Sequence, residues 1–189
     1  MSANSEAIFL PFDTETGGIG PDVSLLTAHF AICDANWNIL AELYLAMKPN
    51  DGIYKTTAEA LTINKIDLIN HDKIALTYSE SGARLRDFIK LHSQDGKIKL
   101  QPMGKNVAFD VLKVTDNILG AKTFNQYVSY RCYDITPLVT FLKRTKRLEL
   151  NAPESLSGLA EYFGITAKWH TADGDNKAGI EVMKILESL

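Results

Sequence analysis

The first part of the chain contains three apolar segments separated by turn residues. An apolar run covers Ile8 to Phe12, and β-branched and aromatic residues dominate residues 23–33 and 39–47. Glycine, proline, asparagine and aspartate gather between and after these runs, at residues 17–21, 34–36 and 48–52. Apolar runs bounded by turn formers predict strands, and the short connections predict an antiparallel meander of three strands.

The rest of the chain is dominated by helical spacing. Apolar residues at this spacing begin near Thr57 and return over residues 79–91, where the expected buried stripe is Leu85, Phe88, Ile89 and Leu91. A short strand is expected over residues 97–102. Further helices are expected after Asn106, from the cap-and-proline pair Thr136-Pro137 to Arg144, over residues 155–163 and over residues 172–189. This order predicts an α/β domain whose mixed sheet, three antiparallel strands followed by shorter strands, carries helices on both faces.

Composition restricts the class of protein. The 189 residues are 46% hydrophobic and 23% charged, which predicts a single domain over residues 1–189. A net charge of −3 argues against a protein that coats nucleic acid with a broad basic face. The sequence contains no predicted signal peptide or membrane span. Cys33 and Cys132 are interpreted as small core residues in a reducing compartment, so we expect a cytoplasmic protein.

Asp13 and Glu15 are the first candidates for chemistry. They lie two residues apart at the end of the first predicted strand, so their side chains project to the same face. Two neighbouring carboxylates repel each other unless a positive charge, most simply a divalent cation, lies between them. Taken alone, the pair is equally well explained as two polar turn residues after an edge strand.

Three separated motifs resemble those of a known enzyme family. They are Asp13-Thr14-Glu15-Thr16-Gly17, the segment Gly104-Lys105-Asn106-Val107-Ala108-Phe109-Asp110, and a His-x-Ala-x-x-Asp pattern from His170 to Asp175. In this order they resemble the DEDD exonucleases, and specifically the branch of that family with a histidine in its third motif. The resemblance covers essentially the whole chain and implies a ribonuclease H-like fold.

The resemblance also implies how the motif residues act. Asp13, Glu15, Asp110 and Asp175 would bind two divalent cations, Mg²⁺ or Mn²⁺, which stabilise the attacking and leaving oxygens of a phosphodiester. His170 would be the general base, because an imidazole titrates near neutral pH. The five-residue interval to Asp175 places His170 on the loop before the last helix. His29, His71 and His92 are expected to be structural or surface residues.

The same resemblance implies a site for the strand end. Thr14, Thr16, Gly17, Gly18 and Ile19 would cradle the terminal nucleotide, where glycines allow the backbone to come close. Leu61 and Asn64 would wall the other side of this pocket, and Ile63 is expected in the core. Lys105 and Asn106, in the second motif, are also expected to contact the substrate, and Lys105 stands where the family often has histidine.

The predicted function is removal of nucleoside 5′-monophosphates from the 3′ end of single-stranded DNA. This 3′–5′ exonuclease could associate with a DNA polymerase or another replication or repair protein, and no membrane partner is expected. Two alternatives remain open. One is an exoribonuclease that trims RNA 3′ ends, and the other is a catalytically silent, nucleic-acid-binding or polymerase-associated scaffold with the same fold.

Overall fold

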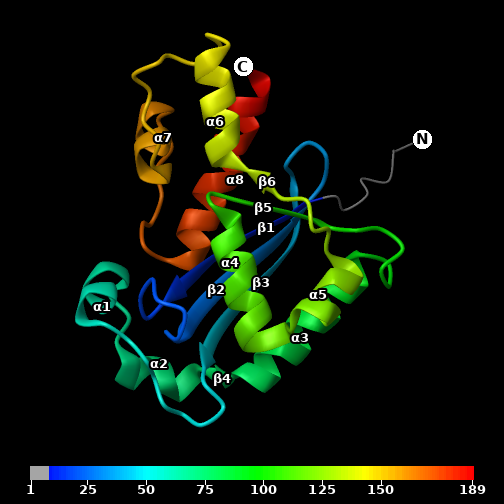
Figure 1. The fold of residues 1–189 in the computed structure, drawn as a ribbon, viewed down its shortest axis with the longest axis vertical. Coiled ribbons are helices and arrows are strands. Elements are labelled where there is room, and N and C mark those ends of the chain that lie inside the picture. Colours follow the sequence, from blue (N-terminus) through cyan, green and yellow to red (C-terminus); the bar gives the residue numbers. More distant parts are fainter. Residues whose placement is uncertain (1–8) are drawn as a thin grey trace.

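A six-stranded sheet forms the centre of the molecule, with the strand order β4-β3-β2-β1-β5-β6 (Figure 1). The computed structural model describes residues 9–189, so Ile8 lies outside the described residues. The strands are β1 (Phe9–Thr16), β2 (Leu25–Cys33), β3 (Ile39–Lys48), β4 (Leu76–Thr77), β5 (Gln101–Gly104) and β6 (Tyr133–Asp134). The first three pair antiparallel, and β4, β5 and β6 each pair parallel with a neighbour. The predicted mixed α/β sheet is therefore confirmed.

Strand β1 is longer than the apolar run that predicts it. Asp13 and Glu15 continue the pairing with β2, opposite His29 and Thr27. On the other edge, pairing with β5 ends at Pro11, opposite Met103. The second half of β1 is therefore paired on one side and leaves its other edge open to the loop and helix that follow β5.

Helices cover both faces of the sheet, as the sequence predicts. They are α1 (Ala58–Asn64), α2 (Leu68–Ile74), α3 (Tyr78–His92), α4 (Val107–Val114), α5 (Ala121–Tyr127), α6 (Ile135–Arg144), α7 (Leu156–Tyr162) and α8 (Ala172–Ser188), and a π-helical turn (Thr115–Leu119) extends α4. Helices α3, α4 and α5 pack on one face, and α6, α7 and α8 lie on the other (Figure 1). Within residues 9–189, every helix falls short of the length and apolarity that a membrane span requires.

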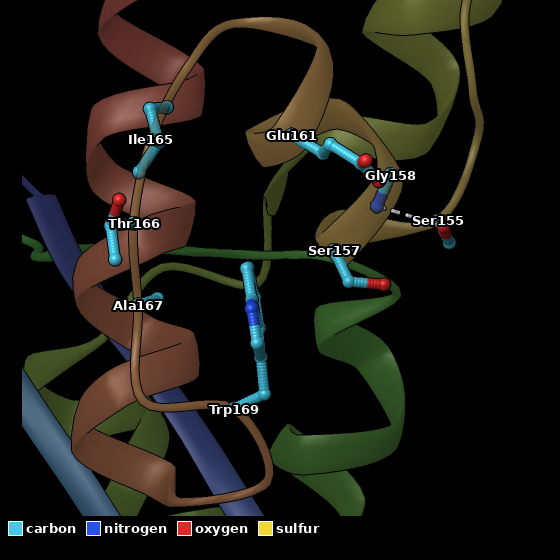
Figure 2. Close-up of a pocket in the computed structure, with 8 residues that line it drawn as sticks. All are labelled: Ser155, Ser157, Gly158, Glu161, Ile165, Thr166, Ala167 and Trp169. Carbon is cyan, nitrogen blue, oxygen red and sulfur yellow. Dashed lines mark hydrogen bonds between the residues drawn. The ribbon is translucent and has the colours of Figure 1, made fainter.

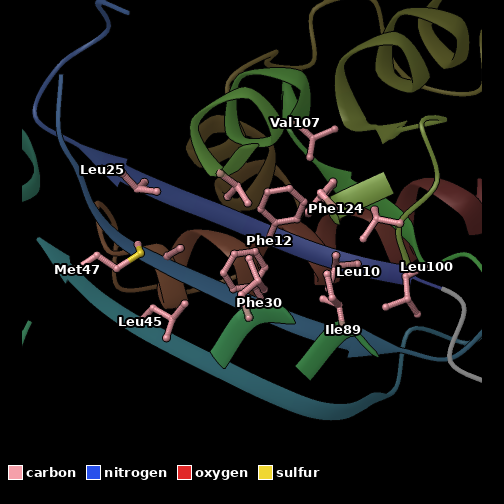
Figure 3. Packing of buried hydrophobic residues seen from close by; sticks show 14 of the residues in the cluster. Leu10, Phe12, Leu25, Phe30, Leu45, Met47, Ile89, Leu100, Val107 and Phe124 are labelled. Atoms are coloured by element: carbon pink, nitrogen blue, oxygen red, sulfur yellow. The ribbon is translucent and has the colours of Figure 1, made fainter. Parts of the chain in front are cut away.

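The alternation of side chains along β1 explains the two cores. Leu10 and Phe12 point into a cluster with α3, α4 and α5, where Phe12 stacks on Phe30 of β2 (Figure 3). Phe9 points to the opposite face and packs against the cluster formed with α6, α7 and α8. Because Asp13 and Glu15 share the parity of Phe9, their side chains project toward the α8 layer.

Several details differ from the sequence-based expectations. Leu91 is 72% exposed, because it lies two residues beyond Ile89 and therefore on the outer side of α3. Cys33 is buried as expected, whereas Cys132 is exposed on the segment before β6. Helix α6 begins earlier than predicted: its N-cap is Asp134, whose side chain accepts a hydrogen bond from the Thr136 amide.

Candidate active site

Three carboxylates meet at the open end of β1. Asp13, Glu15 and Asp175 each offer an oxygen atom such that the three atoms lie within 4.8 Å of one another. The first two come from β1 and the third from the first turn of α8, which packs on the same face of the sheet. The structure thus brings together residues that are more than 150 positions apart in the sequence.

Asp110 reaches the same strand from the other layer. It lies in the first turn of α4 and is buried. Its Oδ1 accepts hydrogen bonds from the Thr14 backbone amide (3.0 Å) and the Thr14 hydroxyl (2.6 Å). The Thr14 amide is free for this contact because β5 stops pairing with β1 at Pro11. Asp110 therefore lies beside Asp13 and Glu15, and Thr14 orients it.

The beginning of α8 fixes Asp175. Thr171 is the N-cap, and its hydroxyl accepts a hydrogen bond from the Gly174 amide. A Cβ at Gly174 would collide with the carbonyl oxygen of Lys168. Glycine is therefore required at position 174, because the preceding loop passes directly over it.

His170 lies on that loop, as predicted, immediately before the cap of α8. Its side chain is exposed, and its backbone adopts the left-handed conformation (φ 61°). Burial raises the pKa of the Asp175 carboxyl, and the nearby His170 backbone opposes that rise. On the preceding residue, the Trp169 ring projects between α7 and residues 165–167, in a groove of about 480 Å³ (Figure 2). The loop is thus anchored on both sides of His170, while the imidazole itself remains accessible.

The crowded carboxylates resist ionisation. Burial raises the pKa of Asp13 well above its ordinary value, and the charges of Asp110, Asp175 and Glu15 raise it further. Burial, followed by the same kind of repulsion, raises the pKa of Glu15 to about 7. Burial also raises the pKa of Asp110 to about 7, against the opposing effect of the Thr14 hydrogen bonds. The pKa of Asp175 is raised by burial as well.

These residues fit a site for hard divalent cations. The Oδ1 atom of Asp175 is buried and has no hydrogen-bond partner among residues 9–189. A buried carboxylate oxygen without a partner is costly unless a cation binds it. Oxygen ligands from several carboxylates are the donors that Mg²⁺ and Mn²⁺ prefer. The arrangement can therefore concentrate divalent cations at the end of β1.

A pocket of about 400 Å³ opens next to Glu15, between the glycine-rich loop after β1 and helix α1. Its lining residues are Thr14, Glu15, Thr16, Gly18, Ile19, Gly20, Val23, Thr57, Glu59, Ala60, Ile63 and Asn64. Asn64 joins the two walls, since its Nδ2 donates to the carbonyl oxygen of Thr16. Gly17 lies buried behind the wall, where a Cβ would collide with the Lys55 carbonyl oxygen.

Two residues of α1 lie elsewhere than expected. Leu61 is half-buried and does not line the pocket within residues 9–189, because it follows Ala60 by about 100° of helix rotation. Ile63, expected in the core, lines the pocket and is 48% exposed. Thr57 and Ala60 also line the pocket and are not among the residues expected there. Their spacing to Asn64 places all three on one side of a helix.

The second-motif residues Lys105 and Asn106 lie at the start of α4, outside the lining of this pocket as far as residues 9–189 define it. The Asn106 side-chain oxygen accepts a hydrogen bond from the Thr136 hydroxyl (2.9 Å). The Asp134 carboxylate accepts hydrogen bonds from the amides of Asn106 and Val107. Asn106 therefore has a structural contact here, and Asp134 connects the N-cap of α6 to the start of α4.

Comparison with known proteins identifies the fold. Models of protein families and curated protein sequences give no match. Solved structures do: exonuclease I superposes with a TM-score of 0.79 and 18% identity, over 97% of this chain and 41% of that chain. Escherichia coli exonuclease I in complex with a dT13 oligonucleotide superposes with a TM-score of 0.81 and 18% identity, again over 97% of this chain and 41% of that chain. This chain has the exonuclease I fold.

The zinc-bound form of the E. coli exonuclease I complex with single-stranded DNA has the same similarity, with a TM-score of 0.80 and 19% identity over 97% of this chain and 41% of that one. The ribonuclease H-like fold predicted from the three motifs is therefore confirmed. The chain spans less than half the length of these exonuclease I chains.

Proposed function

We propose that residues 1–189 form a single exonuclease domain that removes nucleoside 5′-monophosphates from the 3′ end of single-stranded DNA. The observation that carries this proposal is the convergence of four carboxylates from three distant segments beside a nucleotide-sized pocket, where the buried Asp175 Oδ1 has no hydrogen-bond partner among residues 9–189. The exonuclease I fold supports it, since E. coli exonuclease I has been solved with a dT13 oligonucleotide.

Asp13, Glu15, Asp110 and Asp175 would hold two divalent cations, Mg²⁺ or Mn²⁺. When bound, these ions supply the positive charge that activates a water molecule and stabilises the leaving oxygen of a phosphodiester. Asp13 would be the central ligand of this set, because burial raises its pKa and the charges of Asp110, on α4, and Asp175, on α8, raise it further. Thr14 would keep Asp110 in place through its two hydrogen bonds. The protein thereby fixes the geometry in advance of substrate binding.

His170 would accept the proton of the attacking water. Its exposed imidazole stands on the loop that leads into α8, five residues before Asp175. A histidine near neutral pH can accept a proton in one step and release it to solvent in the next. This role accounts for an accessible side chain on a loop that is otherwise anchored.

The pocket beside Glu15 would bind the terminal nucleoside. Ile19, which is 95% exposed, and Ile63 present apolar surface to a base, while Thr14 and Thr16 stand at the strand end. Gly18 has a positive φ of 153°, and its small size lets the loop backbone approach the sugar and phosphate. Association with a DNA polymerase or another replication or repair protein remains a prediction.

Matched DNA and RNA oligonucleotides, each with a free or a blocked 3′ end, test this function. With Mg²⁺ or Mn²⁺, we expect stepwise shortening of 3′-free DNA, release of nucleoside 5′-monophosphates, and loss of activity in EDTA. Faster degradation of RNA would assign the chain to RNA trimming. Binding without degradation under every metal condition would support the silent scaffold instead.

A further inference from the structure

Asn176, the residue after Asp175, is buried between α8 and the sheet. Its Nδ2 lies 3.1 Å from the carbonyl oxygen of Pro11, 3.2 Å from that of His29 and 2.9 Å from the ring Nδ1 of His29. Pro11 precedes Asp13 by two residues on β1, and His29 is the β2 residue paired with Asp13. The side-chain amide of Asn176 therefore joins α8, which carries Asp175, to β1, which carries Asp13, and to the neighbouring strand β2.

The orientation of this amide is determined by its surroundings. Two backbone carbonyl oxygens can only accept hydrogen bonds, so the atom that faces them must be the amide nitrogen of Asn176. The His29 Nδ1 atom faces the same donor and therefore accepts. The ring proton is then on Nε2, which lies 3.1 Å from Glu42 on β3. The Asn176 amide has two N–H bonds, which the two carbonyl oxygens and His29 Nδ1 share; from His29 Nε2 to Glu42 the contact is donor to acceptor.

The network returns to the helix on which it begins. Glu42 Oε1 also lies 2.9 Å from Nζ of Lys177, the residue after Asn176. Polar contacts thus connect α8 to β1, β2 and β3 directly beneath the carboxylates. The buried polar atoms of Asn176 and His29 have partners, whereas Oδ1 of Asp175, the neighbouring residue, has none among residues 9–189.

We propose that Asn176 is a positioning residue that, together with His29, sets the separation of Asp175 from Asp13 and thereby the affinity of the site for divalent cations. This proposal rests on the proposed function, which requires a cation between these carboxylates. Apolar contacts of α8 with the sheet are non-directional, so they fix its position along its axis less closely than hydrogen bonds do. Hydrogen bonds have preferred directions and distances, so they can fix the helix against the mutual repulsion of the carboxylates.

The decisive variant is Asn176→Leu, which has similar size and donates no hydrogen bond. Calorimetric titration with Mn²⁺ alone, without nucleic acid, measures the site directly. We expect the dissociation constant to rise by about 10- to 100-fold, the range typical for the loss of a group that orients metal ligands. Nuclease activity should return toward the wild-type turnover at saturating Mn²⁺, with little change in KM for single-stranded DNA.

His71→Leu is the matched control for the loss of a buried hydrogen bond. His71 is also buried, and its ring Nε2 lies 2.9 Å from the carbonyl oxygen of Met47, joining α2 to β3 outside the carboxylate cluster. This variant should lower Tm and leave Mn²⁺ affinity unchanged. The pair His29→Leu and His29→Gln adds a rescue test, because glutamine keeps one acceptor and one donor. We expect weaker Mn²⁺ binding in the leucine variant, with glutamine restoring affinity to within about threefold of wild type.

The outcomes are distinguishable. If Asn176→Leu lowers Tm as the control does and binds Mn²⁺ with wild-type affinity, the proposal is overturned. Should Asn176→Leu fail to fold, as judged by circular dichroism, the His29 pair decides, and equal affinities of its two members overturn the proposal. Absence of Mn²⁺ binding by the wild-type protein would instead overturn the proposed function, and this inference with it.

Discussion

Asp134 and Asp175 stand at the beginnings of two helices, but their carboxylates have different surroundings. Asp134 accepts hydrogen bonds from three backbone amides, those of Thr136, Asn106 and Val107. Asp175 faces Asp13 and Glu15 and has one buried oxygen without a hydrogen-bond partner among residues 9–189. The Asp134 carboxylate is hydrogen-bonded by backbone amides, whereas the Asp175 carboxylate faces further negative charge.

Structural and functional acidic residues therefore differ in the groups that stabilise their carboxylates. Backbone amides donate hydrogen bonds to the Asp134 carboxylate, so it can cap helices without a ligand. The group around Asp175 has raised pKa values and therefore needs protons or cations to be stable. Substitutions at the first site should affect folding, and substitutions at the second should affect metal binding and turnover.

The largest effect is expected for Asp13→Asn, which keeps the shape of the side chain and removes its charge. Loss of the central ligand should lower hydrolysis of single-stranded DNA by more than about 100-fold, as expected when transition-state charge loses its stabilisation. A steady-state nuclease assay with Mg²⁺ measures this effect. Activity within tenfold of wild type would show that Asp13 is a strand-end turn residue, the simpler reading of the Asp-x-Glu pair.

The next largest effect is expected on the thermal stability of the metal-free protein as pH changes. The folded-state pKa values of Glu15 and Asp110 are about 7, above the values of about 4 in an unfolded chain. The folded protein therefore binds more protons, and its stability should be greatest below about pH 4 for these groups and fall as pH rises to about 7. In EDTA, we expect Tm to decrease by at least about 4 °C between pH 5 and pH 8.

Mn²⁺ should reverse that decrease, and more strongly at pH 8 than at pH 5, because protons compete with the cation for the same oxygens. Thermal unfolding followed by circular dichroism in matched buffers measures both effects. Asp13→Asn is the control, since removal of one charge from the cluster should flatten the dependence on pH. An EDTA-treated wild-type protein that becomes more stable toward pH 8 would contradict this expectation.

Asp134→Ala should act on stability alone. The substitution removes the N-cap of α6 and the acceptor for two amides at the start of α4, so we expect the free energy of unfolding to fall by about 1–2 kcal/mol. Urea denaturation gives this quantity, and calorimetry should find unchanged Mn²⁺ affinity. A loss of metal affinity without a loss of stability would reverse the roles assigned to Asp134 and Asp175.

The smallest effect is expected at the apolar wall of the pocket. Ile19→Ala removes the side chain that is 95% exposed beside the pocket, and we expect KM for single-stranded DNA to rise by about three- to tenfold with kcat little changed. Ile69→Ala, on the exposed face of α2, is the matched control. Equal KM values for the two variants would remove Ile19 from the substrate site.

The sequence predicts the carboxylates better than it predicts their surroundings. Strand parity places Asp13 and Glu15 on one face, and the interval from His170 to Asp175 places the histidine on a loop; both features are local. By contrast, the exposure of Ile63 depends on how α1 packs on the glycine-rich loop, and the contact of Asp110 with Thr14 depends on where β5 stops pairing. Such features arise from tertiary packing, which side-chain periodicity does not encode.

The shortest strands could not be predicted from the sequence either. Strands β4 and β6 have two residues each, so no alternation of side chains can identify them.

Gly174 shows a different limit of sequence reasoning. Its low helix propensity predicts a weak start to α8, whereas the close approach of the Lys168 carbonyl requires glycine there. A propensity argument alone assigns that glycine the wrong meaning.

Anomalous diffraction from crystals soaked in Mn²⁺ at pH 8 tests the central claim most directly. The carboxylate cluster should show Mn²⁺ peaks at about 2.0–2.3 Å from oxygens of Asp13 and Asp175, with Oδ1 of Asp175 as a ligand, and no peak at Asp134. Well-ordered carboxylates without a peak at a Mn²⁺ concentration that saturates nuclease activity would contradict the account.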